Sequence, residues 1–329
     1  MEEVIREYAP VVIPTLCRFE HFKRCIESLS NCTGAERTVV YVGLDYPAKE
    51  SHWDGYNKIK DYLESCGNLG FKELIVIRRE KNYGCGQNGN YATLRNMIFE
   101  KYDRYISTED DNEFSPCFLD YMNKGLEMFK DDDAIFSICG FCHDYDIGNY
   151  PYNYYVDYGL SAWGIGLWRD KYLAYQKFCA ANPPRTLLLS PNLFKAFRND
   201  LNAVNALLIM NRKRVFWGDY YMTIYCRLKG LHNISPTVRK VRNHGLDGTG
   251  VHCTKKRDNV YSRMPIDDAV TFEYDRIQDV ICKRQYIEKG LTPYRKLPMR
   301  EFIRMMSNAA IFILLLFVDI FDKRRRFPR

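Results

Sequence analysis

The stretch that decides the fold is residues 105–113, which read YISTEDDNE. A short apolar run ends there in three consecutive carboxylates, those of Glu109, Asp110 and Asp111. Adjacent carboxylates repel one another unless a cation or hydrogen bonds offset their charge. An isolated acidic triplet is usually a solvated turn, so the rest of the chain must decide between a turn and a metal-assisted site.

Short β-branched runs alternate with helical patterns around this triplet. The pattern predicts strands at residues 11–13, 38–44, 73–77, 104–108 and 135–139, and helices near residues 22–29, 53–63 and 91–102 and after Pro116. Such alternation is typical of a mostly parallel sheet flanked by helices. The predicted fold class is therefore α/β.

Polar residues follow each of the first four predicted strands. Pro14 and Thr15 follow the first strand, Asp45 the second, Arg78 and Arg79 the third, and the acidic triplet the fourth. Parallel strands bring their carboxyl ends to one edge of a sheet, where ligands collect in nucleotide-binding folds. We therefore expect these residues to form one ligand site.

A glycine-rich loop keeps an NAD-dependent oxidoreductase open as an alternative. Residues 84–89, GCGQNG, match the dinucleotide fingerprint G-x-G-x-x-G, and Asp110 follows at about the distance of a ribose-binding acid. That fingerprint normally follows the first strand of its unit directly, whereas residues 78–82 intervene here and two strands come earlier. A ribose-binding acid also works alone, which leaves the neighbouring carboxylates unexplained.

In this order and spacing, the motifs resemble those of the GT-A-fold glycosyltransferases, especially family 2. Residues 12–15, VIPT, are similar to the opening strand of that family, whose end contacts the nucleotide base. Asp45 matches the acid that binds uracil or ribose in relatives, and Asn82, Gly84 and Asn88 resemble the loop and helix after the third strand. The resemblance covers residues 10–253 and implies a Rossmann-like GT-A fold with an acceptor-side, helical C-terminal half.

The acidic triplet is similar to the Asp-x-Asp element of this family, in the Glu-Asp-Asp form of N-acetylglucosaminyltransferase I and its relatives. The resemblance implies that Asp111 binds Mn²⁺ or Mg²⁺, that Asp110 faces the ribose and that Glu109 braces the loop or joins the metal site. The metal would act as a Lewis acid on the nucleotide diphosphate leaving group. Arg78 or Arg79 would offset the remaining charge, unless they form an ordinary surface pair.

The second half supplies a candidate base within residues 215–221, VFWGDYY. In the resemblance, the acid after this tryptophan removes the acceptor proton, which assigns that role to Asp219 and implies inversion at the sugar carbon. An acid in a first helical turn also simply stabilises the helix dipole. His252, or alternatively His244, lies in a glycine-rich loop and is expected to contact the metal or the diphosphate.

The C-terminal region carries a nearly apolar run, residues 309–321, AAIFILLLFVDIF, with basic residues on both sides. The run is shorter than the roughly twenty residues that cross a bilayer, and Asp319 interrupts it. We expect a helix at residues 305–321 that either packs in the core or lies on an anionic leaflet, where each Lys or Arg gains about 1 kcal/mol.

Composition and the chain start agree with a cytoplasmic enzyme at the inner face of the membrane. The first residues lack the basic and apolar regions of a secretory signal, and the 12 cysteines are scattered, as in proteins of a reducing compartment. The formal net charge of +7 favours an anionic substrate or a membrane surface. Much of this excess lies in the C-terminal tail, so we expect no nucleic-acid partner.

These expectations combine into one functional hypothesis. Residues 1–140 would bind the nucleotide sugar, residues 141–260 would bind the acceptor and supply the base, and residues 261–329 would form a C-terminal extension. The expected reaction transfers a hexosyl or N-acetylhexosaminyl group, most simply from a UDP-sugar, to a glycan or lipid-linked acceptor in surface polysaccharide synthesis. A non-catalytic nucleotide-sugar-binding protein on the same fold is the other alternative.

Overall fold

A computed structural model describes residues 5, 7–86, 88–142, 150–196, 201–250, 259–275 and 299–321. The chain divides into two compact units. Unit 1 comprises Met1–Leu173 and His232–Leu291, and unit 2 comprises Ala174–Leu231 and Thr292–Arg329. These units are defined by packing, so the expected functional divisions at residues 140 and 260 stay predictions.

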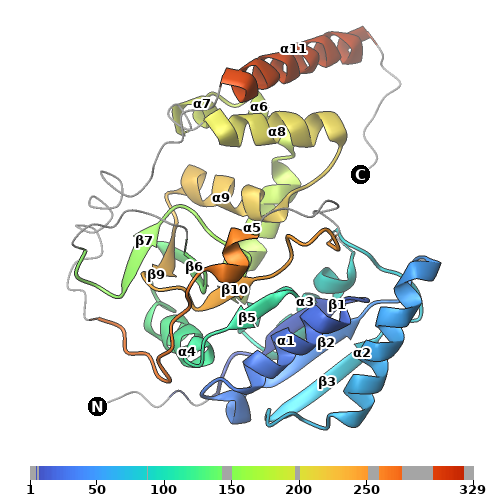
Figure 1. The fold of residues 1–329 in the computed structure, drawn as a ribbon. Helices are drawn as coiled ribbons and strands as arrows, with labels where there is room; N and C mark the ends of the chain where they lie inside the picture. The colour runs from blue at the N-terminus through green and yellow to red at the C-terminus, as the bar shows by residue number, and fades with distance from the viewer. Residues whose placement is uncertain are drawn as a thin grey trace. The chain divides into compact units, whose positions relative to one another are not determined.

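Unit 1 contains a large mixed sheet (Figure 1). Its strands are β1 (Val11–Thr15), β2 (Val39–Leu44), β3 (Glu73–Arg78), β4 (Arg104–Ser107), β6 (Ile135–Cys139), β7 (Tyr154–Asp157), β8 (Ile165–Trp168) and β9 (His232–Pro236). They form an 8-stranded sheet in the order β3-β2-β1-β4-β8-β6-β9-β7. Strands β1 to β4 are parallel, as are β6 and β9. Strand β8 is antiparallel to β4 and β6, and β7 is antiparallel to β9. The predicted α/β class with a largely parallel sheet is confirmed.

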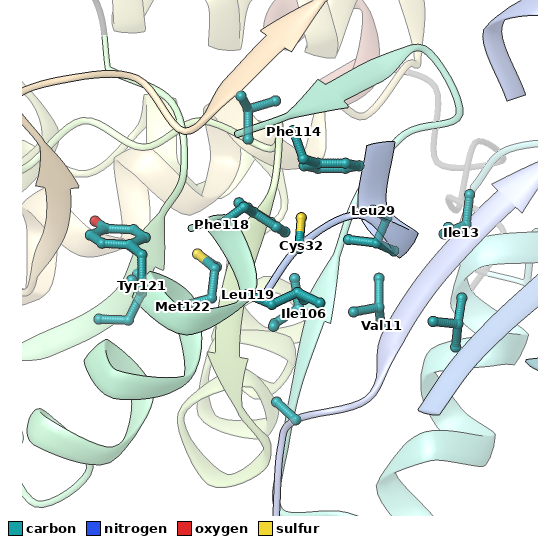
Figure 2. Close-up of a cluster of buried hydrophobic side chains, with 14 of the residues drawn as sticks. Val11, Ile13, Leu29, Cys32, Ile106, Phe114, Phe118, Leu119, Tyr121 and Met122 are labelled. Atoms are coloured by element: carbon teal, nitrogen blue, oxygen red, sulfur yellow. The ribbon is translucent and has the colours of Figure 1, made fainter. Parts of the chain in front are cut away.

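The helices of unit 1 contact its strands or one another. They are α1 (Phe19–Ser30), α2 (Trp53–Ser65), α3 (Asn90–Lys101) and α4 (Phe118–Met128), with short 3₁₀ turns η1 (Ala35–Arg37), η2 (Glu50–His52) and η3 (Val260–Arg263). In α1 the buried residues Phe22, Cys25, Ile26 and Leu29 recur at helical spacing, so one apolar stripe faces inward. Figure 2 shows Leu29 in the core with side chains from β1, β4 and α4.

Unit 2 is helical in its described part. Helix α5 (Arg169–Ala181) begins in unit 1 and continues into unit 2, where α6 (Pro184–Leu188), α7 (Pro191–Ala196), α8 (Leu201–Lys213), α9 (Gly218–Lys229) and α11 (Met299–Phe321) follow. Helix α11 packs on α8 through buried Asn308, which accepts a hydrogen bond from Arg212 at 2.9 Å and donates one to Asn205 at 3.3 Å. Across the described residues, no helix has the length and apolarity that a membrane crossing requires.

The structure differs from the sequence-based prediction in two respects. Strand β1 continues through Pro14, which is tolerated because β1 pairs with β4 only at Val11 and Val12, so no ladder hydrogen bond is lost there. The second half also contributes strands β7 to β9, and β10 (Val241–Asn243) pairs antiparallel with β5 (Asn112–Phe114). Strand β9 reads HNISP and is buried throughout. Its sequence lacks the apolar run that predicts a buried strand.

Candidate functional site

The predicted site residues follow strands that end at the same edge of the sheet. Because β1 to β4 are parallel, Thr15, Asp45, Arg78 and the acidic triplet all lie at the carboxyl ends of adjacent strands. Pro14 is the penultimate residue of β1. The expected common edge is confirmed, although the structure does not give these residues equivalent surroundings.

Only two of the three consecutive carboxylates are buried. The exposed fractions of Asp110 and Asp111 are 5% and 6%, whereas Glu109 is exposed. A buried charge is stable only when it is paired and hydrogen-bonded. The carboxylates of Asp110 and Asp111 therefore need hydrogen-bond donors or cations around them. The exposed carboxylate of Glu109 does not need them for its burial.

Arg18 bridges the two buried carboxylates. Its guanidinium donates from Nη1 to Oδ2 of Asp111 at 2.7 Å and from Nη2 to Oδ1 of Asp110. The other two oxygens also accept hydrogen bonds, Oδ2 of Asp110 from the Thr15 hydroxyl at 2.8 Å and Oδ1 of Asp111 from the Asn243 amide at 2.7 Å. Every oxygen of the pair thus has a donor from the chain itself.

The ionisation of this cluster reflects burial opposed by pairing. Burial lowers the pKa of Arg18, but Asp110 and Asp111 raise it by more, so the pKa lies above its ordinary value and the guanidinium stays charged. Burial raises the pKa of Asp110 above its usual value, and Asp111 adds to this rise while Arg18 and Thr15 oppose it. Two carboxylates therefore share one permanent cation.

Strand β10 positions the second wall of the site. Asn243 pairs with Asn112 in the β5–β10 register, which carries its amide to Asp111, and the backbone N–H of His244 donates to the Asp111 carbonyl at 2.8 Å. A Cβ at Gly245 would lie 2.1 Å from Oδ2 of Asp111, so only glycine fits beside the carboxylate.

The two loop histidines of the sequence prediction have separate outcomes. The His244 imidazole lies 2.7 Å from Oε2 of Glu113, and this hydrogen bond is the main reason that the pKa of Glu113 is lowered. Its ring thus contacts an acid outside the predicted metal triplet. His252 lies outside the described residues, and its role stays a prediction.

Asp45 organises the loop after β3. Its Oδ1 accepts the backbone N–H groups of Tyr46 at 2.9 Å and Tyr83 at 2.8 Å, and its Oδ2 accepts the Gly84 N–H at 2.8 Å and the Asn82 amide at 3.3 Å. The predicted residues Asp45, Asn82 and Gly84 are therefore brought together. Three of these four hydrogen bonds hold residues 82–84 of the loop.

The two arginines after β3 have protein partners of their own. Arg78 forms an ion pair with Glu64 at 2.7 Å on the surface, which corresponds to the surface-pair alternative. Arg79 donates to the Asn90 side chain at 2.9 Å and lies over the Tyr83 ring, 4.9 Å from its centroid. Both side chains thus form contacts away from the acidic pair. Asn88 lies in the turn that leads into α3.

Asp219 is the second residue of α9, in unit 2. It is exposed, and its Oδ1 accepts the backbone N–H of Tyr220 at 2.8 Å. The predicted position in a first helical turn is confirmed. Its role as a base stays a prediction.

The donor set suits a divalent ion that arrives with a phosphate ligand. Among the described residues, no group of three or more His, Cys, Asp and Glu could hold a metal by itself. Mg²⁺ is commonly held by one or two carboxylates, with waters and substrate phosphates completing its coordination. The pair of Asp110 and Asp111 has this chemistry, and Arg18 leaves one of its two negative charges uncompensated.

Sequence reasoning missed Arg18 and Asn243. The available signal for Arg18 was its position three residues after Thr15, just beyond the end of β1. Asn243 gave no local signal, because it reaches Asp111 from 132 positions away through the pairing of β5 and β10.

Comparison with known proteins gave matches to solved structures alone. No protein-family model and no curated protein matched the chain. The chain is similar to the mannosyltransferase PcManGT from Pyrobaculum calidifontis, solved with GDP-Man and Mn²⁺, with 9% identity over 68% of this chain and 69% of that chain and a TM-score of 0.38. It is similar to S. aureus TarS 1–349 with 12% identity over 70% and 60% of the two chains and a TM-score of 0.35.

A third similar structure is the glycosyltransferase GlyE in Streptococcus pneumoniae TIGR4. Identity is 12% over 70% of this chain and 46% of that chain, with a TM-score of 0.34. The match to a longer TarS structure spans 21% of that chain.

Proposed function

We propose that the protein is a metal-dependent glycosyltransferase that uses a nucleotide diphosphate sugar, with a UDP-sugar as the first donor to test. The observation that carries this proposal is the buried pair of Asp110 and Asp111 at the carboxyl edge of four parallel strands, with one cation for two charges. Ligands collect at this edge in folds of this type. A divalent ion would bind the carboxylates and offset the charge of a diphosphate ligand at this edge.

Asp111 would hold Mn²⁺ or Mg²⁺, which as a bound Lewis acid offsets charge on a departing diphosphate. Because Asp110 is buried beside Asp111 and shares Arg18 with it, we propose that Asp110 also binds the metal, instead of the ribose that the sequence suggests. Thr15 and Asn243 orient the two carboxylates through their hydrogen bonds. Asp45 fixes the loop at residues 82–84, which would lie beside the nucleotide. Asp219 is the proposed base for the acceptor hydroxyl, a role that implies inversion.

We also propose a glycan or lipid-linked acceptor met at an anionic membrane surface. Helix α11 exposes an apolar stripe that includes Met299, Ile303, Met306 and Leu314, at helical spacing. Exposed arginines at positions 300 and 304 lie beside it in sequence, and residues 323–326 read KRRR. An apolar stripe with flanking positive charge is typical of helices that lie in an anionic interface.

Calorimetric titration with UDP, with and without Mn²⁺, tests the donor site. We expect binding by the wild type only when Mn²⁺ is present, and loss of that binding in Asp111→Ala. Glu109→Ala tests the expectation that Glu109 joins the metal site. Because its side chain is exposed, we expect this variant to bind like the wild type. Binding of UDP without metal, or no binding at all, would refute the proposal, and a parallel titration with NAD would then test the oxidoreductase alternative.

A further inference from the structure

The cation that pairs with the buried carboxylates is a side chain of the protein itself. Arg18 contacts one oxygen of Asp110 and one of Asp111, so its two-pronged guanidinium lies across both side chains at once. A divalent ion that binds both carboxylates needs oxygens from the same two groups. The proposed metal and Arg18 would therefore compete for oxygens of the same two carboxylates.

The charge at the site explains when each partner is favoured. Without ligand, Arg18 offsets half of the charge of the pair, and every carboxylate oxygen has a donor. A nucleotide diphosphate brings further negative charge, which one guanidinium cannot balance. A divalent ion that arrives with the diphosphate offsets this added charge, and the diphosphate offers the guanidinium a new partner that suits its fork.

The surroundings of Arg18 allow the exchange. Arg18 precedes the first turn of α1, and its side chain retains 19% exposure, so it can leave without opening the core. Thr15 and Asn243 still hold one oxygen of each carboxylate after its departure. The carboxylates thus remain oriented while their cation changes.

We infer that Arg18 and a divalent metal are alternative partners of Asp110 and Asp111, and that Arg18 makes metal binding depend on the diphosphate ligand. The inference rests on the proposed function for the identity of that ligand. Arg18 acts as a positioning residue, because it bridges the two carboxylates and competes with the metal for their oxygens. Metal alone should bind weakly, and metal with nucleotide should bind strongly.

Mn²⁺ binding without nucleotide tests this directly. In calorimetric titrations of the full chain, we expect Arg18→Met to bind Mn²⁺ roughly tenfold more tightly than the wild type, because the competing cation is gone. UDP should strengthen Mn²⁺ binding in the wild type by a larger factor than in Arg18→Met. Arg104→Met is the matched control. Arg104 is the first residue of β4, at the end opposite to the acidic pair, and forms an ion pair with Glu127 at 2.6 Å, so its loss should leave the Mn²⁺ affinity unchanged.

Circular dichroism would show whether Arg18→Met is misfolded, and Arg18→Lys provides a second variant for that case. Lysine keeps the charge but lacks the fork, so its Mn²⁺ affinity should lie between those of the wild type and Arg18→Met. Equal Mn²⁺ affinities in the wild type and the Arg18 variants, or no Mn²⁺ binding by any of them, would overturn the inference. If UDP fails to bind the wild type with Mn²⁺, the proposed function fails, while the titrations with Mn²⁺ alone still decide the role of Arg18.

Discussion

At the scale of single residues, Gly245 sets the position of the Asp111 carboxylate. A Cβ there would lie 2.1 Å from Oδ2, so in Gly245→Ala the loop or the carboxylate must shift, and we expect the carboxylate to move relative to Arg18. We expect roughly tenfold weaker binding of UDP with Mn²⁺, since a small misplacement of a ligand group is costly. Calorimetry measures this loss. Gly218→Ala is the control, because its Cβ meets nothing within 4 Å, and an equal loss in both variants would contradict the explanation.

Asp247 predicts a pH dependence of stability. Burial raises its pKa, but hydrogen bonds from Thr249 and the contact with His21 at 2.8 Å outweigh this and lower the pKa to about 2. A folded-state pKa below the ordinary 3.8 stabilises the protein above about pH 4, and this contribution disappears as the pH falls towards 2.

Urea unfolding of the wild type and Asp247→Asn tests this sign. We expect the wild type to be more stable at pH 7 by on the order of 1 kcal/mol or less, because the side chain is partly exposed. The difference should shrink between pH 4 and pH 2. A difference that stays constant over that interval would show that the aspartate contributes through shape and not through charge.

At the scale of elements, the strands with local signals were predictable. The strands β1 to β4 and β6 appear in the sequence as short runs rich in β-branched and other apolar residues, and the helical spacing of Phe22 to Leu29 predicts α1. Strands β5 and β10 have 3 residues each, and the pairing of Asn243 with Asn112 depends on contacts distant in sequence. The acidic end of the site and Thr15 could therefore be predicted, and Arg18 was missed although it follows β1 closely. Asn243 could not be found from local sequence.

Helix α11 carries the membrane prediction. Ile303 and Leu314 have exposed fractions of 59% and 64%, and burying them in an interface would remove apolar surface from water. We expect Ile303→Glu with Leu314→Glu to weaken sedimentation with vesicles of anionic lipid by roughly tenfold or more. Val270→Glu, at a position 62% exposed in unit 1, is the control. Equal sedimentation of the double variant and the wild type would exclude α11 as the contact.

At the scale of the whole molecule, the proposed roles fall in different units of the chain. The acidic pair belongs to unit 1, and Asp219 belongs to unit 2. If unit 1 binds the donor and Asp219 acts on the acceptor, variants at the two places should have separable effects on binding and on turnover.

Asp219→Asn decides between an enzyme and a non-catalytic binding protein. We expect it to bind UDP with Mn²⁺ as the wild type does, because the donor ligands are unchanged, and to lose roughly 10²- to 10⁴-fold in turnover, the usual contribution of a general base. Release of UDP from a panel of UDP-sugars, measured with and without added glycan acceptors, gives turnover, and calorimetry gives binding. Asp111→Ala should lose both. If the wild type releases no UDP from any donor while binding it with Mn²⁺, the fold serves as a sensor or carrier, and the carboxylate of Asp219 stabilises only the first turn of α9.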